Sequence, residues 1–264
     1  MKQNLETLPA SPALVSRFLD IRERPEINPK KDDFKDVFSD EQSRKHAFWE
    51  AKKAFEFIFE RATFLRHLEQ KPNKESFIYL KRVRSFGLIL KSLYFFVNSS
   101  HKCTEKLSKF LYFLGQYNDS YNIAPSEENK KEIINNIDVI DLSINFCNTS
   151  EFRGYATGVL SEIEKLLQEK IFPVKKFHVL RIKIRSLANL TQTLAVENYG
   201  GSLHWLFYSL DMLSREMGKH HKKLVQKGLR GEINYDKSMV EIEPHIALEF
   251  NRIKPFIEKV CGLK

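Results

Sequence analysis

Apolar residues recur at helical spacing through most of the chain between residues 43 and 260. Short polar breaks that contain Pro, Gly or Asn separate these stretches, and no segment shows a convincing alternation of polar and apolar residues. The pattern therefore predicts an all-α protein. The expected helices span residues 43–69, 75–97, 102–123, 127–147, 151–170, 174–197, 202–228 and 237–260.

Eight expected helices suggest an internal repeat of four. The second and sixth helices align through their apolar residues at an offset of 101 (180 − 79), which pairs Tyr79, Val83, Phe86 and Leu93 with Leu180, Ile184, Leu187 and Leu194. This register places Arg82 opposite Lys183 and Arg84 opposite Arg185. One helix later Gly115 matches Gly218 at an offset of 103, and Gly200-Gly201 accounts for the two extra residues.

The duplication predicts two pseudo-symmetric four-helix bundles, the first at residues 41–148 and the second at 149–264. Residues 1–40 hold four prolines and lack sustained periodicity, which indicates an extended or loosely packed lead-in. Neither a signal peptide nor a membrane span is evident, so the expected location is the cytoplasm. Three widely separated cysteines suit neither a disulfide framework nor a zinc site, and we expect buried or idle thiols.

Charge indicates an anionic partner. The chain holds 43 basic and 34 acidic residues, and the excess of +9 divides into +3 for residues 1–150 (24 and 21) and +6 for residues 151–264 (19 and 13). No carboxylate occurs between Glu75 and Glu105, or between Glu169 and Glu197. Surface helices usually mix charges because Glu–Lys pairs at i,i+4 support them, and that support is missing from both runs.

Cationic side chains in these two runs are the candidate site. In the second run His178, Arg181 and Arg185 fall on one stripe of the helix, away from the apolar stripe. Lys81, Arg84 and Lys91 share a stripe in the first run. Arginine offers bidentate hydrogen bonds to phosphate, lysine a point charge, and histidine a donor whose protonation an anion favours. The alternative interpretation is the solvated face of a basic protein. The predicted phosphate-binding residues are His178, Arg181, Lys183, Arg185, Lys176, Arg82, Arg84, Lys81, Lys91, Lys219, Lys222 and Lys223.

The stretch FHVLRIKIRSL, residues 177–187, resembles the signature of the CHAD family, the conserved-histidine α-helical domain, in which Arg follows His by three residues and further cations follow. LGQYND, residues 114–119, resembles the Leu-Gly-x-x-Arg/Asn-Asp turn of that family. The resemblance covers residues 41–264 and implies a pseudo-twofold pair of four-helix bundles that binds inorganic polyphosphate, in association with polyphosphate granules.

Both copies depart from this pattern. In the register given above Phe77 stands where the first histidine belongs and Leu80 where its arginine belongs. Ser186 and Ala188 replace cations, and Lys222 replaces the second Asp of the turn. In that turn Asp119 is expected to cap or brace helices rather than to touch a ligand.

Lys219-His220-His221-Lys222-Lys223 is expected to be a second basic patch. Adjacent histidines point about 100° apart on a helix, and no third ligand follows at usable spacing, so no metal is predicted. Aromatic residues fall mostly at core spacing. The common nucleotide, zinc-protease and hydrolase motifs are absent, and Glu241-Ile242-Glu243, in an expected helix, lacks the Lys of the tunnel-domain motif Glu-x-Glu-x-Lys found in fusions with the family.

The leading hypothesis is a non-catalytic module that binds inorganic polyphosphate or a similar polyanion and needs no cofactor. An RNA- or DNA-binding helical protein that uses the same basic face is the first alternative. A protein-interaction scaffold that has kept the fold and lost its ligand is the second. A competition experiment between long-chain polyphosphate and RNA distinguishes the polyphosphate-binding module from the nucleic-acid-binding protein. A protein that does not bind phosphate chains would indicate the interaction scaffold.

Overall fold

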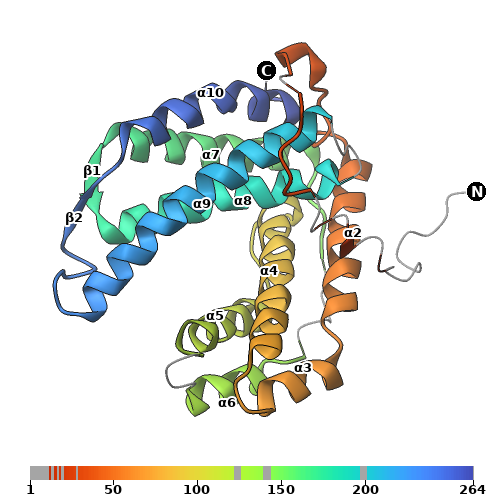
Figure 1. Cartoon of the computed structure of the whole chain (residues 1–264). Helices are drawn as coiled ribbons and strands as arrows, with labels where there is room; N and C mark the ends of the chain where they lie inside the picture. Colours follow the sequence, from red (N-terminus) through yellow and green to blue (C-terminus); the bar gives the residue numbers. More distant parts are fainter. Residues whose placement is uncertain are drawn as a thin grey trace, which may run out of the picture. The chain divides into compact units, whose positions relative to one another are not determined.

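The computed structural model describes residues 12, 15, 16, 18, 21–27, 29–121, 126–138, 144–196 and 201–263. Within these ranges it contains nine α-helices and one short two-stranded sheet, and the predicted all-α class is confirmed (Figure 1). None of the helices so described is both long and apolar enough to cross a membrane.

The chain divides into two compact units. The first comprises Met1–Leu19 and Arg44–Cys147, and the second comprises Asp20–Ser43 and Asn148–Lys264. The expected lead-in is thus shared between the units, and its later part belongs to the second.

The first unit is built on two long helices and three others. Its helices are α2 (Glu41–Ile58), α3 (Arg61–Glu69), α4 (Lys74–Val97), α5 (Glu105–Ser120) and α6 (Glu127–Asn135). Phe48 of α2 packs against Tyr94 of α4 with ring centroids 5.1 Å apart. Ser126 caps the start of α6, because its side chain accepts a hydrogen bond from the backbone N–H of Asn129.

One expected helix, 43–69, is two helices. The carboxylate of Glu60 accepts hydrogen bonds from the backbone N–H groups of Ala62 and Thr63 and so caps the start of α3. Phe59, at the break, packs against Phe55 and other rings of the core. Capping competes with helix continuation, and a periodic apolar pattern cannot reveal that the chain has turned.

The prediction of one helix over residues 127–147 is also wrong, because the helix ends well before residue 147. The helix α6 ends at Asn135, and residues 139–143 lie outside the described part of the chain. The backbone N–H of Ser99 donates to the carbonyl of Asn145, and that of Cys147 donates to the carbonyl of Val97, so residues 145–147 run along the end of α4 in an extended form. Cys147 is buried as predicted, and its carbonyl accepts a hydrogen bond from the buried Arg44 guanidinium at 3.0 Å.

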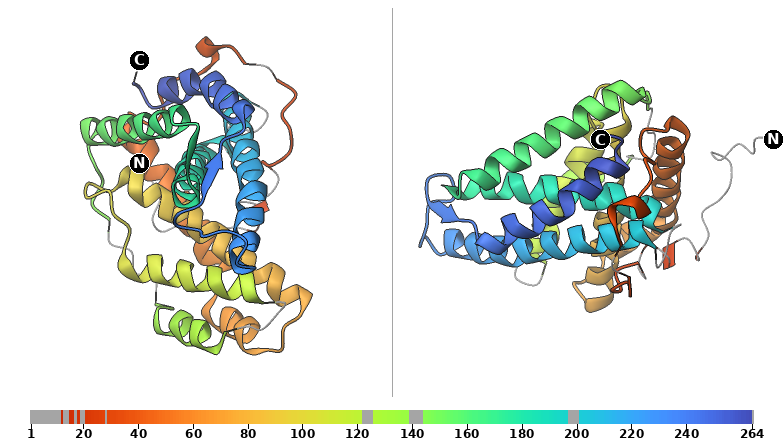
Figure 2. Two further views of the ribbon diagram at one scale, coloured as in Figure 1. Left: turned by 90° about the vertical axis from the view of Figure 1, so that its left-hand side faces the viewer. Right: turned by 90° about the horizontal axis from the view of Figure 1, so that it is seen from above.

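The second unit contains four long helices that run alongside one another (Figure 2). They are α7 (Thr149–Gln168), α8 (Val174–Ala195), α9 (Ser202–Leu229) and α10 (Pro244–Val260). The predicted apolar stripe of α8, formed by Leu180, Ile184, Leu187 and Leu194, is buried. Gly201 precedes α9 as its N-cap residue, which agrees with the predicted glycine break.

Two short strands, which the sequence did not indicate, tie together the ends of these helices. The strand β1 (Ile171–Pro173) pairs antiparallel with β2 (Met239–Glu241), with Phe172 opposite Val240. Residues 237–243, expected to be helical, therefore form a strand and a turn, and α10 begins at Pro244, a residue suited to the first helical position. Three residues per strand are too few to show a period of two.

Part of the expected lead-in packs into the second unit. Phe34 and Phe38 are buried, and Phe34 contacts the rings of Trp205 and Phe256. Backbone N–H groups of Val37 and Phe38 donate to the carbonyl of Val260. The described residues 29–40 contain one 3₁₀ turn, at Lys31–Asp33, and otherwise no regular structure, but they are not loosely packed. Prolines exclude a regular helix without excluding burial.

Candidate anion-binding site

The helices α8 and α9 form an antiparallel hairpin that positions the candidate residues. Arg181 lies against Gly218, where an added Cβ would stand 3.2 Å from its Nε and Nη2 atoms. Three residues earlier on α8, the ring of His178 stacks on that of His221 with centroids 4.6 Å apart. Glycine at position 218 therefore lets the arginine side chain lie close to the α9 backbone beside the paired imidazoles.

The paired imidazoles are anchored on the α9 side. A hydrogen bond of 2.6 Å joins Nε2 of His221 to the hydroxyl of Tyr235, which belongs to the connection between α9 and β2. Nδ1 of His178 is buried and makes no hydrogen bond with a described residue. We call His178, Arg181, Arg185 and His221 the basic cluster.

Positive charge dominates the electrostatics of the basic cluster. The pKa of His178 is lowered by burial and then by the charges of Arg181 and Arg185. The pKa of His221 is lowered to about 4, first by burial and then by His178, the two arginines and His220. Both rings are therefore neutral at pH 7. An anion placed beside them would reverse the charge contribution and favour their protonation.

Other cations predicted on α8 point elsewhere. Lys183 forms an ion pair with Glu162 of α7, and Lys176 forms one with Glu169 at 2.8 Å. The prediction that the second run is unopposed by carboxylates is therefore wrong for these two lysines, whose acidic partners come from α7 and from the turn that follows it. Lys219, Lys222 and Lys223 are exposed on α9.

The first unit repeats one contact of the second. Arg84 of α4 lies against Gly115 of α5, where an added Cβ would stand 2.6 Å from its Nη2 atom. Arg84 therefore occupies the place that Arg181, not Arg185, has in the second unit. The offset along α8 is 97 (181 − 84), one helical turn away from the offset of 101 that the apolar pattern indicated. Both offsets align buried positions, so burial alone could not distinguish them.

At the offset of 97, which aligns the two arginine–glycine contacts, each first-unit residue stands opposite a different second-unit residue. Lys81, rather than Phe77, stands opposite His178, and its ammonium lies 4.3 Å from the centre of the Phe77 ring. Leu88 stands opposite Arg185. Asn118 stands opposite His221 at the offset of 103, and both polar atoms of its buried side chain lack a hydrogen-bond partner among the described residues.

The remaining predicted phosphate-binding residues of the first unit, Arg82 and Lys91, do not lie beside Arg84. Arg82 is exposed, two residues along the helix and therefore on another face. Lys91 is half-buried near Cys103, and burial lowers its pKa. Burial likewise lowers the pKa of Arg84, against the opposing charge of Asp119. The expected role of Asp119 in bracing the helices stays a prediction.

Two members of the second-unit site were not predicted as ligands of the anion. His221 had been assigned to the separate patch 219–223, although its ring stacks on His178. Tyr235 carried no signal, because a single Tyr in a polar connection is not distinctive. An antiparallel hairpin places residues 178 and 221 together, and only the register of the two helices reveals this.

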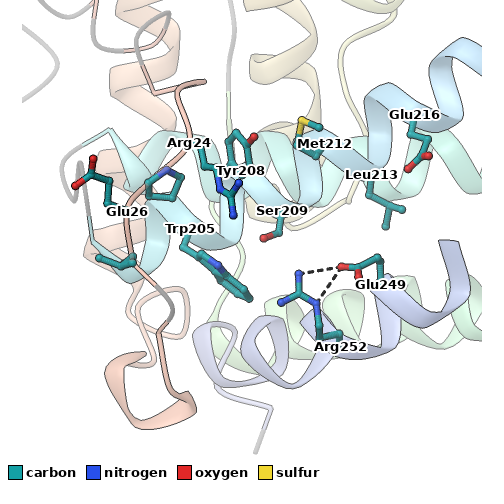
Figure 3. Close-up of a pocket in the computed structure, with 12 residues that line it drawn as sticks. Arg24, Glu26, Trp205, Tyr208, Ser209, Met212, Leu213, Glu216, Glu249 and Arg252 are labelled. Atoms are coloured by element: carbon teal, nitrogen blue, oxygen red, sulfur yellow. Dashed lines mark hydrogen bonds and ion pairs between the residues drawn. The ribbon is translucent and has the colours of Figure 1, made fainter. Parts of the chain in front are cut away.

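A separate pocket of about 970 Å³ lies within the second unit between residues 24–27, α9 and α10 (Figure 3). The guanidinium of Arg252 lies 5.2 Å from the centre of the Trp205 ring and pairs with Glu249 at 2.8 Å. Glu216 lies at one end of the pocket. None of the predicted phosphate-binding residues lines it.

A comparison with protein-family models, curated proteins and solved structures finds none that matches this chain.

Proposed function

We propose that the second unit binds inorganic polyphosphate or a similar polyanion at the basic cluster, without catalysing a reaction on it. The observation that carries the proposal is the placement of two stacked, partly buried imidazoles beside Arg181 and Arg185. Each group in this arrangement lowers the proton affinity of its neighbours. A multiply charged anion offsets that mutual repulsion.

Each member of the basic cluster has a chemical role in this proposal. The guanidinium groups of Arg181 and Arg185 donate paired hydrogen bonds to phosphate oxygens. His178 and His221 donate through their ring N–H groups and take up protons as the phosphate approaches. Exposed Lys219, Lys222 and Lys223 of α9 extend the positive surface toward the next phosphates of a chain.

We further infer that the two units are copies of one helical module, similar to the CHAD family. The Arg84–Gly115 and Arg181–Gly218 contacts support this inference, because each joins the helix of an acid-free run to the helix that follows it. In this proposal the first copy has kept the arginine and lost the imidazoles. A cytoplasmic protein associated with polyphosphate granules would fit such a ligand.

The test is a titration of the full chain with long-chain polyphosphate at two salt concentrations. The double variant Arg181→Gln/Arg185→Gln should bind at least about 10-fold more weakly than the unmodified chain, since each charge-assisted hydrogen bond contributes about 1.5–3 kcal/mol. Affinity should also fall with added salt, as counterion release requires.

Lys175→Gln/Lys176→Gln is the matched control. It removes two positive charges from the same helix, where both lysines are exposed and paired with Asp236 and Glu169. It should weaken binding by less than about 3-fold, as expected for exposed pairs. If both double variants lose polyphosphate affinity equally, the ligand binds a diffuse basic surface rather than the basic cluster. RNA that displaces polyphosphate at equal phosphate concentration would favour a nucleic-acid ligand, and no binding of either would favour a scaffold.

A further inference from the structure

Carboxylates and imidazoles meet where α9 passes the start of α10. Nε2 of His245 lies 2.9 Å from a carboxylate oxygen of Glu216, and Nδ1 of the same ring lies 3.5 Å from Glu243. Nδ1 of His220 lies 3.7 Å from the other oxygen of Glu243. We call Glu216, His220, Glu243 and His245 the carboxylate–imidazole cluster.

These contacts are ion pairs when the histidines are protonated, but two of the ring nitrogens involved have no hydrogen-bond geometry. Nε2 of His245 and Nδ1 of His220 are buried, yet neither makes a hydrogen bond with a described residue. Glu243 occupies the N-cap position of α10, and its side chain makes no capping hydrogen bond. Its carboxylate instead faces two histidines. A buried polar atom without a partner is uncommon and indicates a missing ligand, water or ion.

The backbone holds the four side chains in position. Glu216 and His220 are four residues apart on α9, so they share one face of that helix. Glu243 and His245 flank Pro244, the first residue of α10, whose ring fixes the backbone between them. The β1–β2 pairing ends at Glu241, two residues before Glu243. These constraints limit the rearrangement that a ligand would require.

We propose that Glu216, Glu243 and His245, with His220 as a fourth ligand, bind one divalent transition-metal ion such as Zn²⁺. The ligand atoms of Glu216, Glu243 and His245 all lie within 4.8 Å of one another. Ligands about 2.0–2.2 Å from a tetrahedral zinc ion are roughly 3.3 Å apart, so small side-chain movements close the site. Two carboxylates balance the charge of the ion, and imidazole favours zinc over magnesium.

The location gives the ion access to solvent. Glu216 and Glu243 are exposed and His245 is half-exposed, and Glu216 also lines one end of the pocket. The metal would bind beside the basic cluster without sharing a residue with it, because His220 and His221 point to different neighbours. This proposal is therefore independent of the proposed function.

Zinc titration of the full chain, after removal of metal with a chelator and dialysis, tests the site. We expect one Zn²⁺ per chain by calorimetry, a rise in melting temperature with added Zn²⁺, and no comparable effect of Mg²⁺. His245→Ala and Glu216→Gln should each weaken Zn²⁺ binding by about 10-fold or more. Circular dichroism checks that each variant is folded.

His221→Ala is the matched control, because it removes an adjacent imidazole that belongs to the basic cluster. It should leave Zn²⁺ affinity within about 2-fold of the unmodified chain. Absence of saturable Zn²⁺ binding would overturn the proposal, as would binding that survives His245→Ala or that His221→Ala removes equally. Polyphosphate binding that persists in His245→Ala keeps this result separate from that of the anion site.

Discussion

The helix pair α4–α5 of the first unit and the helix pair α8–α9 of the second contain the same kind of contact. The charged groups near that contact differ between the two pairs. In both, an arginine lies against a helical glycine. The charges of Arg181 and Arg185 act on the stacked rings of His178 and His221, whereas the charge that acts on Arg84 is that of Asp119. Because an acid faces the arginine of one pair and imidazoles face that of the other, the same contact can brace helices in one unit and attract anions in the other.

The largest expected difference concerns the two arginines themselves. Arg181→Gln should weaken polyphosphate binding by about 10-fold or more, while Arg84→Gln should weaken it by less than about 3-fold, because Asp119 already opposes the charge of Arg84. Fluorescence anisotropy with labelled polyphosphate measures both. Equal effects would mean that the two units bind alike and would remove the distinction drawn here.

We expect polyphosphate binding to be coupled to proton uptake only at the second unit. Binding should tighten as the pH falls from 7.5 to 5.5, by up to about 10-fold per pH unit for each proton that His178 or His221 takes up. The pKa values of both rings are low in the free protein, and phosphate raises them, so protons are absorbed on binding. The variant His178→Gln/His221→Gln should flatten the pH profile. If the variant keeps the same pH dependence of polyphosphate affinity, groups other than these two histidines take up the protons.

The same rings should make the ligand-free second unit sensitive to acid. The pKa of His221 is about 4 in the folded protein against 6.5 for the free side chain, so between these values the unfolded chain binds more protons and stability falls as the pH is lowered. Allowing for partial exposure of the ring, the loss is about 1–2 kcal/mol. Urea unfolding at pH 7 and pH 4.5 measures it, and His221→Gln should reduce the difference. Stability unaffected by the substitution at both pH values would contradict this expectation.

The smallest expected effects on polyphosphate binding are those of substituting the two glycines, Gly218 and Gly115. Gly218→Ala should move Arg181 by a few tenths of an ångström and weaken polyphosphate binding by about 2- to 3-fold, while alanine adds up to about 1 kcal/mol of helix stability. Gly115→Ala displaces Arg84 and should leave binding unchanged. Titration and thermal unfolding of both variants separate the effects. A loss of binding in Gly115→Ala would show that Arg84 also contacts the anion.

Much of the helical framework could be predicted from the sequence. Apolar spacing located α4, α8 and α9 to within a few residues, and the aromatic residues Phe55, Phe59 and Phe64 are core as expected. Boundaries were wrong where a local interaction replaced helix propagation. Glu60 caps α3 inside an expected helix, and the three-residue strand β2 replaces the expected start of α10.

The candidate site was predicted only in part. His178, Arg181 and Arg185 could be grouped because they share one stripe of one helix. Lys183 was grouped with them although its partner, Glu162, lies on α7, twenty-one residues earlier. His221 was omitted because its position beside His178 depends on how α9 is aligned with α8. Residues on one helix are related by fixed angles, whereas residues on two helices are related only by packing.

The sequence by itself determined the helical class, the buried faces of the long helices and the presence of two cationic runs without carboxylates. These follow from periodicity and charge, which act within one segment of chain. Tertiary structure alone decided which cations are neutralised, which arginine meets which glycine, and which carboxylates surround His245. Such pairings depend on distances of a few ångströms between helices, and at that range a shift of one helical turn exchanges every partner.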